Sequence, residues 1–195
     1  MEGHPKRFFG TASEVCSALA KMRAHERAAR GQHEGNEIPR ALGEKIMIAV
    51  SRVNECARCS YLHTRFALER GVPDSEVRAL CSGEDADLTD GEAVVVAYAQ
   101  HWADSGGEPS PEARARMIER HGAAGTIHAE LIAHRVHVGN MMCNTVEAFR
   151  SGAGSGRCRL FRAYLLCAPA AFFIGVLGAR GRRFLSGQKE SREGS

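Results

Sequence analysis

The chain has 195 residues, of which 44% are hydrophobic and 25% are charged, a balance that is ordinary for a globular protein. Its net charge of +3 is small and scattered along the sequence, which argues against a nucleic-acid-binding protein. This length is enough to bury a hydrophobic core in one domain, or in one domain with an appendage. Few windows have the composition of strands, so we expect an all-α fold.

The N-terminal part of the chain predicts a single helix. Residues 1–10 have the character of a loose leader, and from Ser13 to Arg30 apolar residues recur at helical spacing among charges. Cys16 is expected on the buried side of this helix. We therefore assign residues 1–36 to a leader and an N-terminal helix.

A succession of helices is predicted over residues 37–150, which we interpret as the main domain. Pro39 suits the first turn of a helix that runs to about Val53, and a cysteine-bearing helix then ends at Gly71. The next two helices are predicted to start at Asp74 or Ser75 and at Thr89, where Glu92 occupies the capping-box position. A further helix starts at Ser110 and ends around Gly122, and a long helix covers residues 126–149.

The glycine-rich stretch from Ser151 to Gly156 is the clearest linker in the chain. Residues 157–185 follow it as a third unit, an apolar helix with seventeen uncharged residues at 163–179. One interpretation is a helix buried against the domain or a second subunit, and the other is membrane contact by residues 160–180. A spanning helix needs roughly 17–25 apolar residues, and Pro169 interrupts this stretch, so a buried or oligomer-interface helix is favoured.

Cysteine usage bears on the compartment. Seven cysteines are an odd number, so they cannot all pair within the chain. The N-terminal residues contain no apolar stretch of a secretory signal peptide, so a cytoplasmic, reducing location is expected. In such a location a Cys-x-x-Cys motif indicates catalysis or metal binding rather than a structural disulfide. The cysteines outside the motif are interpreted as small buried apolar residues: Cys16, Cys81, Cys143, Cys158 and Cys167.

The stretch from Glu44 to His63 carries the candidate chemistry. Cys56, Cys59 and His63 are spaced so that a helix opening just before them presents all three on one stripe. With Asn54 as the predicted N-cap, Cys56 lies in the first turn, where unpaired amides favour a thiolate over a thiol. Glu44 lies on the preceding helix and is the natural acid/base partner if the two helices pack together.

Three interpretations of the cysteine pair are open: redox chemistry, a zinc site, and structural thiols. Redox chemistry is favoured because this stretch supplies a thiolate, a second thiol to resolve a sulfenic acid, and a proton shuttle. Zinc prefers four ligands, and only His63 lies near the pair in sequence, so Cys81 or His128 would have to complete the site.

A second pattern combines Glu130, His134 and His137 on the predicted helix over 126–149. This spacing resembles half of a carboxylate-bridged di-iron site, but the sequence has no matching second Glu-x-x-His. We interpret these side chains as partly buried hydrogen-bonding groups, with His128 or His134 as further candidates to line the thiol pocket. No metal and no cofactor is expected.

The pattern E-x11-C-x2-C-x3-H, formed by Glu44, Cys56, Cys59 and His63, resembles the AhpD-like alkylhydroperoxidases within the carboxymuconolactone decarboxylase superfamily. The Gly-Val-Pro-Asp-Ser-Glu segment after the motif is also similar, and the resemblance covers about residues 38–150. The branch that decarboxylates muconolactones lacks the cysteine pair, so the resemblance favours peroxidase chemistry over decarboxylation.

This resemblance implies an AhpD-like helical bundle that forms homo-oligomers and reduces hydroperoxides. Cys59 would be the peroxidatic thiol, deprotonated through Glu44 and His63. Cys56 would be the resolving thiol, reduced again by a dithiol reductant or a lipoyl-type adaptor protein. Arg58 stands where some members carry a histidine, and its guanidinium can stabilise a thiolate but cannot relay a proton at neutral pH.

We therefore predict an alkylhydroperoxidase-like thiol peroxidase, an oxidoreductase that works through a Cys56–Cys59 redox cycle. The alternative is a helical oligomer without enzymatic activity that docks on a membrane or a protein partner. In that alternative the cysteine pair would act as a redox sensor or as a zinc clasp.

Overall fold

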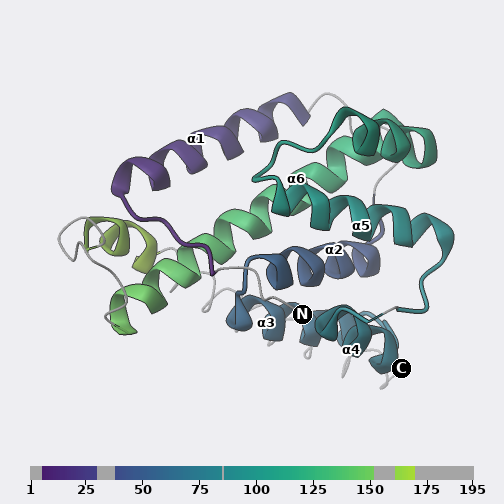
Figure 1. Ribbon diagram of the computed structural model, residues 1–195, viewed down its shortest axis with the longest axis horizontal. Coiled ribbons are helices and arrows are strands. Elements are labelled where there is room, and N and C mark those ends of the chain that lie inside the picture. Colours follow the sequence, from purple (N-terminus) through teal and green to yellow (C-terminus); the bar gives the residue numbers. More distant parts are fainter. Residues whose placement is uncertain (1–5, 30–37, 85, 152–160, 170–195) are drawn as a thin grey trace, which may run out of the picture.

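The computed structural model describes residues 6–29, 38–84, 86–151 and 161–169, and within these ranges every regular element is a helix. The helices are α1 (Ala12–Ala29), α2 (Arg40–Val53), α3 (Ala57–Glu69), α4 (Asp74–Ser82), α5 (Asp90–Asp104) and α6 (Pro111–Ser151), and a further helical segment covers 161–169. Figure 1 shows this all-helical arrangement, which confirms the predicted fold class.

The helix α2 lies at the centre of the bundle, in contact with α3, α4, α5 and α6 (Figure 1). Its apolar residues point in two directions. Ile46 and Val50 pack with Val95 of α5, whereas Ile48 belongs to a second cluster that includes Val77 of α4. Each fully buried side chain of this size contributes roughly 1.5–3 kcal/mol. Burial on two sides therefore fixes α2, and with it the residues that α2 contributes to the site.

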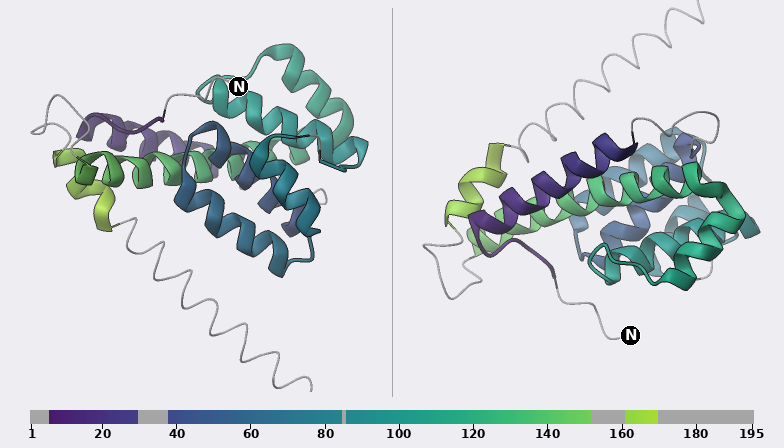
Figure 2. Two further views of the ribbon diagram at one scale, coloured as in Figure 1. Left: turned by 60° about the horizontal axis from the view of Figure 1, so that its bottom comes forward. Right: turned by 90° about the horizontal axis from the view of Figure 1, so that it is seen from above.

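The long helix α6 carries a second layer. Among the described helices α1 packs on α6 alone, and the two views of Figure 2 show α1 lying along α6. Phe9 and Val15 pack there against Val138 and Met142 of α6. This contact is formed by the apolar stripe that the N-terminal sequence predicts.

The segment 161–169 returns to the same end of α6. Ala163 and Cys167 join the cluster between α1 and α6, and Tyr164 stacks on Phe149 with ring centroids 4.3 Å apart. One face of the described part of the predicted C-terminal helix therefore packs against the domain, while the remainder of that helix lies outside the described residues. No helix in the described part of the chain is long and apolar enough to cross a membrane.

Several predicted boundaries are confirmed. Thr89 caps α5 with a complete capping box, in which its side chain accepts from the Glu92 amide and the Glu92 carboxylate accepts from the Thr89 amide. Gly71, in the left-handed region with φ of 82°, follows the end of α3. Gly122 interrupts α6 with φ of 69° and ψ of 170°, where the sequence predicts the break between two helices.

The start of α3 differs from its prediction. Asn54 is not the N-cap of α3 but the C-cap of α2, and Glu55 follows it with a positive φ of 53°. Cys56 is itself the N-cap, and α3 begins at Ala57. The buried side chain of Asn54 is engaged elsewhere, by a 3.1 Å hydrogen bond with Nδ1 of His137 on α6. A tertiary contact thus replaces the local capping bond.

The predicted burial of the cysteines outside the motif is only partly correct. Cys16 and Cys81 are exposed, contrary to prediction, because each lies on the outward stripe of its helix. Cys143 and Cys167 are buried, and Cys158 lies outside the described residues.

Candidate thiol site

Three cysteines meet at the junction of α2, α3 and α6. Cys56 and Cys59 lie at the start of α3, and Cys143 comes from α6; all three sulfur atoms lie within 4.8 Å of one another. The three residues form a buried cluster of their own and are not cross-linked. Their exposed fractions are 2%, 8% and 9%, so bulk water reaches them little. The sequence brings only two of these thiols together, and the fold supplies the third.

The three cysteines of the cluster shift one another's pKa values. The side chains of Cys56 and Cys59 beside the Cys143 sulfur lower the pKa of Cys143 to about 3, and the nearby Arg58 guanidinium acts in the same direction. The Cys143 sulfur in turn raises the pKa of Cys56 to about 11 and raises the pKa of Cys59 further. The thiolate form is therefore favoured most at Cys143, because two neighbouring thiols and the Arg58 guanidinium stabilise it.

His63 lies one helical turn after Cys59 on α3, and its side chain contacts Glu44 of α2. Nδ1 of His63 is 2.8 Å from Oε2 of Glu44, across the interface between α2 and α3. The other oxygen of Glu44 forms an ion pair with Arg70 at the end of α3. Burial lowers the pKa of His63 to about 4, so the imidazole is neutral at pH 7. The contact is therefore a hydrogen bond that Nδ1–H donates to the carboxylate, and Arg70 is the charged partner of Glu44.

Buried amides hold the α2–α3 junction against α6. Nδ2 of Asn144 donates to the backbone oxygen of Asn54 at 2.8 Å, and Oγ of Ser51 donates to Oδ1 of Asn140 at 3.1 Å. All four residues are fully buried. A buried carbonyl at a helix end needs such a partner, so these bonds fix the position from which α3 starts.

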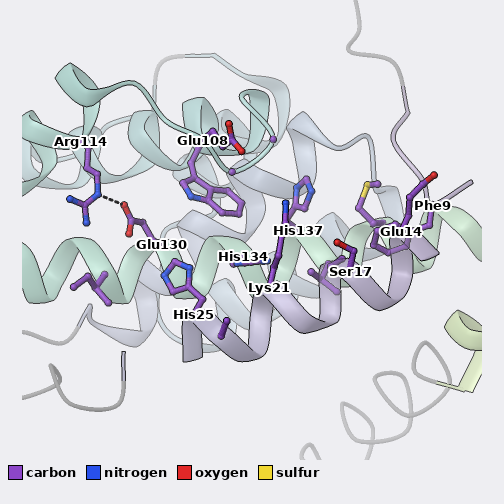
Figure 3. A pocket seen from close by; sticks show the side chains of 18 residues that line it. Phe9, Glu14, Ser17, Lys21, His25, Glu108, Arg114, Glu130, His134 and His137 are labelled. Atoms are coloured by element: carbon purple, nitrogen blue, oxygen red, sulfur yellow. Dashed lines mark hydrogen bonds and ion pairs between the residues drawn. The ribbon is translucent and has the colours of Figure 1, made fainter. Parts of the chain in front are cut away.

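The second motif, Glu130, His134 and His137, lines a different cavity. This cavity, hereafter the histidine groove, has a volume of about 800 Å³ and lies between α1, α6 and the loop before α6. In Figure 3, Lys21 and His25 of α1 face Glu130 and His134 of α6 across it. None of its lining residues is a cysteine.

These residues do not assemble as a metal site or as part of the thiol pocket. The Glu130 carboxylate accepts a 2.6 Å hydrogen bond from Tyr98 and a 3.0 Å bond from Arg114, and the His137 ring is bonded to Asn54. Among the described residues, the three cysteines are the only group of three or more side chains placed to hold a metal ion. His134 lines the histidine groove, and Nδ1 of His128 accepts from the Ile38 amide, so the prediction that either lines the thiol pocket is wrong.

Cys143 is the site residue that the sequence analysis misses. Its prediction as a small apolar core residue accounts for its burial but not for its neighbours. One signal was available: His137, Asn140 and Asn144 form a polar stripe at helical spacing on an otherwise apolar helix, and Cys143 lies beside that stripe. Such a stripe indicates a buried polar junction rather than a simple core face.

Comparison with known proteins supports part of this assignment. Residues 17–101 match the model of the carboxymuconolactone decarboxylase family. The match includes Glu44, Cys56, Cys59 and His63 and ends before α6, so Cys143 lies beyond it. No curated protein matches the chain. Residues 17–101, which hold the Cys-x-x-Cys motif and its Glu–His pair, are therefore similar to the carboxymuconolactone decarboxylase family, within the AhpD-like superfamily.

Proposed function

We propose that the protein is a thiol-dependent peroxidase that reduces hydroperoxides through a Cys56–Cys59 disulfide cycle. One observation carries the proposal: two neighbouring thiols lie at the start of α3, and His63, one turn after Cys59 on that helix, is hydrogen-bonded to Glu44 of α2. A nucleophile, a resolving partner and a proton carrier within two turns are the parts that such a cycle needs.

The cycle balances as follows. Cys59 passes its proton to His63 as its sulfur attacks the outer oxygen of the hydroperoxide. The O–O bond breaks, the leaving alkoxide takes up that proton and departs as an alcohol, and Cys59 becomes a sulfenic acid. The thiol of Cys56 then attacks that sulfur, so a disulfide forms and water leaves. A dithiol reductant, free or carried as a lipoyl group by an adaptor protein, restores both thiols by disulfide exchange.

The proposed proton relay runs through His63. With Nδ1–H donated to Glu44, Nε2 is the unprotonated nitrogen, and a neutral imidazole can take the proton that Cys59 must lose. The imidazolium so formed is stabilised by the Glu44 carboxylate and returns its proton to the leaving alkoxide. Arg70 forms an ion pair with the other oxygen of Glu44, which favours the charged carboxylate. Arg58 replaces a relay histidine, and its contribution is the positive charge beside the sulfurs.

We further propose a homo-oligomer. Tyr61 and Leu68 on the outer side of α3 are 66% and 41% exposed, and Leu165 and Leu166 of the segment 161–169 are 52% and 46% exposed. Apolar side chains of this size commonly mark protein contacts when they are clustered. Light scattering should give a mass above that of one chain, and Tyr61→Glu should lower it.

The test is thiol counting after a stoichiometric pulse of an organic hydroperoxide. The wild-type protein should lose two thiols, which peptide mapping assigns to Cys56 and Cys59. Cys59→Ser should abolish peroxide consumption, with Cys81→Ser, at an exposed cysteine outside the cluster, as the matched control. Peroxide consumption by Cys59→Ser at the wild-type rate would refute the proposal.

A second candidate function is supported by the third thiol. Three sulfurs within 4.8 Å of one another match the spacing of a soft-metal site, and thiolates select ions such as Zn²⁺ or Cu⁺. The protein would then be a non-enzymatic redox or metal sensor. Metal analysis of protein purified without chelators decides between the two: stoichiometric zinc that Cys56→Ser removes, together with no peroxide consumption, favours the sensor.

A further inference from the structure

Cys143 has no part in the Cys56–Cys59 cycle, yet its sulfur lies within 4.8 Å of both sulfurs of that pair. We propose that Cys143 is a third redox-active thiol, which takes over the disulfide from the Cys-x-x-Cys pair and presents it to the reductant. This inference rests on the proposed thiol cycle and assigns a role to a residue beyond the family match.

The geometry suits disulfide exchange. A disulfide has an S–S distance of about 2.05 Å, shorter than the largest separation in the cluster. A rotation about χ1 moves a cysteine sulfur far enough to close that difference. Cys56 is the N-cap residue of α3, with φ of −98° and ψ of 85°, so it lies outside the regular helix. The short distances between the sulfurs place Cys143 of α6 within reach of either cysteine of α3 after side-chain rotation.

Access favours Cys143 as the thiol that meets the reductant. Cys143 lines a cavity of about 270 Å³ whose other walls are Arg58, Val146, Glu147, Arg150 and Ser151. Arg58 and Arg150 are exposed, so the mouth of this cavity is at the surface. Two guanidinium groups there also favour the thiolate form of an approaching reductant.

The proposed exchange conserves electrons. The Cys143 thiolate attacks one sulfur of the Cys56–Cys59 disulfide, so a new S–S bond to Cys143 forms and the other cysteine of the pair leaves as a thiolate. One cysteine of the pair is then reduced, and the other is joined to Cys143 by a disulfide. An external dithiol attacks Cys143 or its partner sulfur and leaves as its own disulfide.

The chain provides a matched control for burial alone. Cys167 is buried near the same end of α6, and burial raises its pKa to about 11. It is not part of the thiol cluster. If burial near α6 alone made a thiol redox-active, Cys167 would be oxidised as readily as Cys143.

The first experiment removes the resolving thiol. In Cys56→Ser, built on Cys16→Ser, Cys81→Ser and Cys158→Ser to silence other thiols, one equivalent of hydroperoxide should produce a Cys59–Cys143 disulfide on peptide mapping. Cys167 should stay reduced. Sulfinic acid at Cys59 with Cys143 still reduced would overturn the inference.

A second oxidant separates this inference from the peroxidase proposal. 2,2′-Dithiodipyridine needs no peroxide chemistry, and in the same variant it should release two equivalents of pyridinethione and produce the same Cys59–Cys143 bond. If the wild-type protein ignores peroxide but this bond forms, the peroxidase proposal fails and the inference stands. One equivalent released, with a stable mixed disulfide, overturns the inference.

The third experiment uses the intact pair and decides the matter if Cys56→Ser does not fold. In oxidised Cys143→Ala, reduction of the Cys56–Cys59 disulfide by dithiothreitol should be at least tenfold slower than in the wild type. Cys167→Ala should reduce at the wild-type rate. A Cys143→Ala rate within twofold of the wild type would show that the disulfide does not pass through Cys143.

Discussion

The helix α6 contributes to two polar regions that differ in how their side chains are bonded. In the histidine groove Glu130 accepts hydrogen bonds from Tyr98 and Arg114, and His137 is bonded to Asn54. In the thiol cluster the three sulfurs lie within 4.8 Å of one another and no disulfide joins them. Side chains with fixed hydrogen-bond partners stabilise a fold. Neighbouring thiols that shift one another's pKa values are instead typical of reactive sites.

The largest predicted difference between the two regions is in catalysis. Glu44→Gln removes the charge that supports His63 and should lower the rate of peroxide consumption roughly 100-fold, the usual size of a lost acid/base partner. Glu130→Gln makes the same chemical change in the histidine groove and should leave that rate within twofold. Rates are measured by stopped flow under excess peroxide. An equal fall in the rate of peroxide consumption in both variants would contradict a catalytic role specific to Glu44.

Acid should affect both regions alike. Burial lowers the pKa of His63 and of His137 to about 4, so each stays neutral in the folded protein while the unfolded chain binds a proton below about pH 6.5. Stability is therefore complete above pH 6.5 and is lost as the pH falls toward 4, by up to about 1.4 kcal/mol per pH unit for each histidine.

Urea unfolding at pH 7.5, 6.0 and 5.0 measures this loss. His63→Asn and His137→Asn should each flatten the dependence of the unfolding free energy on pH. An unchanged slope in both buried variants would contradict the prediction.

A smaller effect is expected from one hydrogen bond in the histidine groove. Tyr98→Phe removes the 2.6 Å bond to Glu130 and should lower the unfolding free energy by about 1–2 kcal/mol. The number of thiols lost to peroxide should not change, because the bond lies outside the thiol cluster. A change in thiol reactivity would mean that the two regions are coupled through α6.

The smallest effect serves as a reference outside both regions. Thr89→Ala removes the cap of α5 and should cost about 1 kcal/mol in unfolding free energy. Thr89→Ser keeps the capping oxygen and should recover most of the loss. Peroxide consumption at a temperature where both variants are folded should match the wild type.

Helix ends show how far local signals reach. The capping box at Thr89 and the glycines at 71 and 122 predict boundaries correctly, because each signal is read within one turn of backbone. The break at Asn54 and Glu55 is misplaced by the same reasoning. A non-glycine residue with positive φ has no local signature, and the Asn54 side chain is held by His137 from a distant helix.

The amino-acid sequence by itself determined the all-helical fold, through the spacing of apolar residues, and the placement of Cys59 and His63 one turn apart on one helix. Only the tertiary structure decided that Glu44 meets His63 and Arg70, and that Cys143 joins the thiol pair. The physical reason is that contacts between helices depend on how their faces pack, and periodicity within a helix does not encode its neighbour.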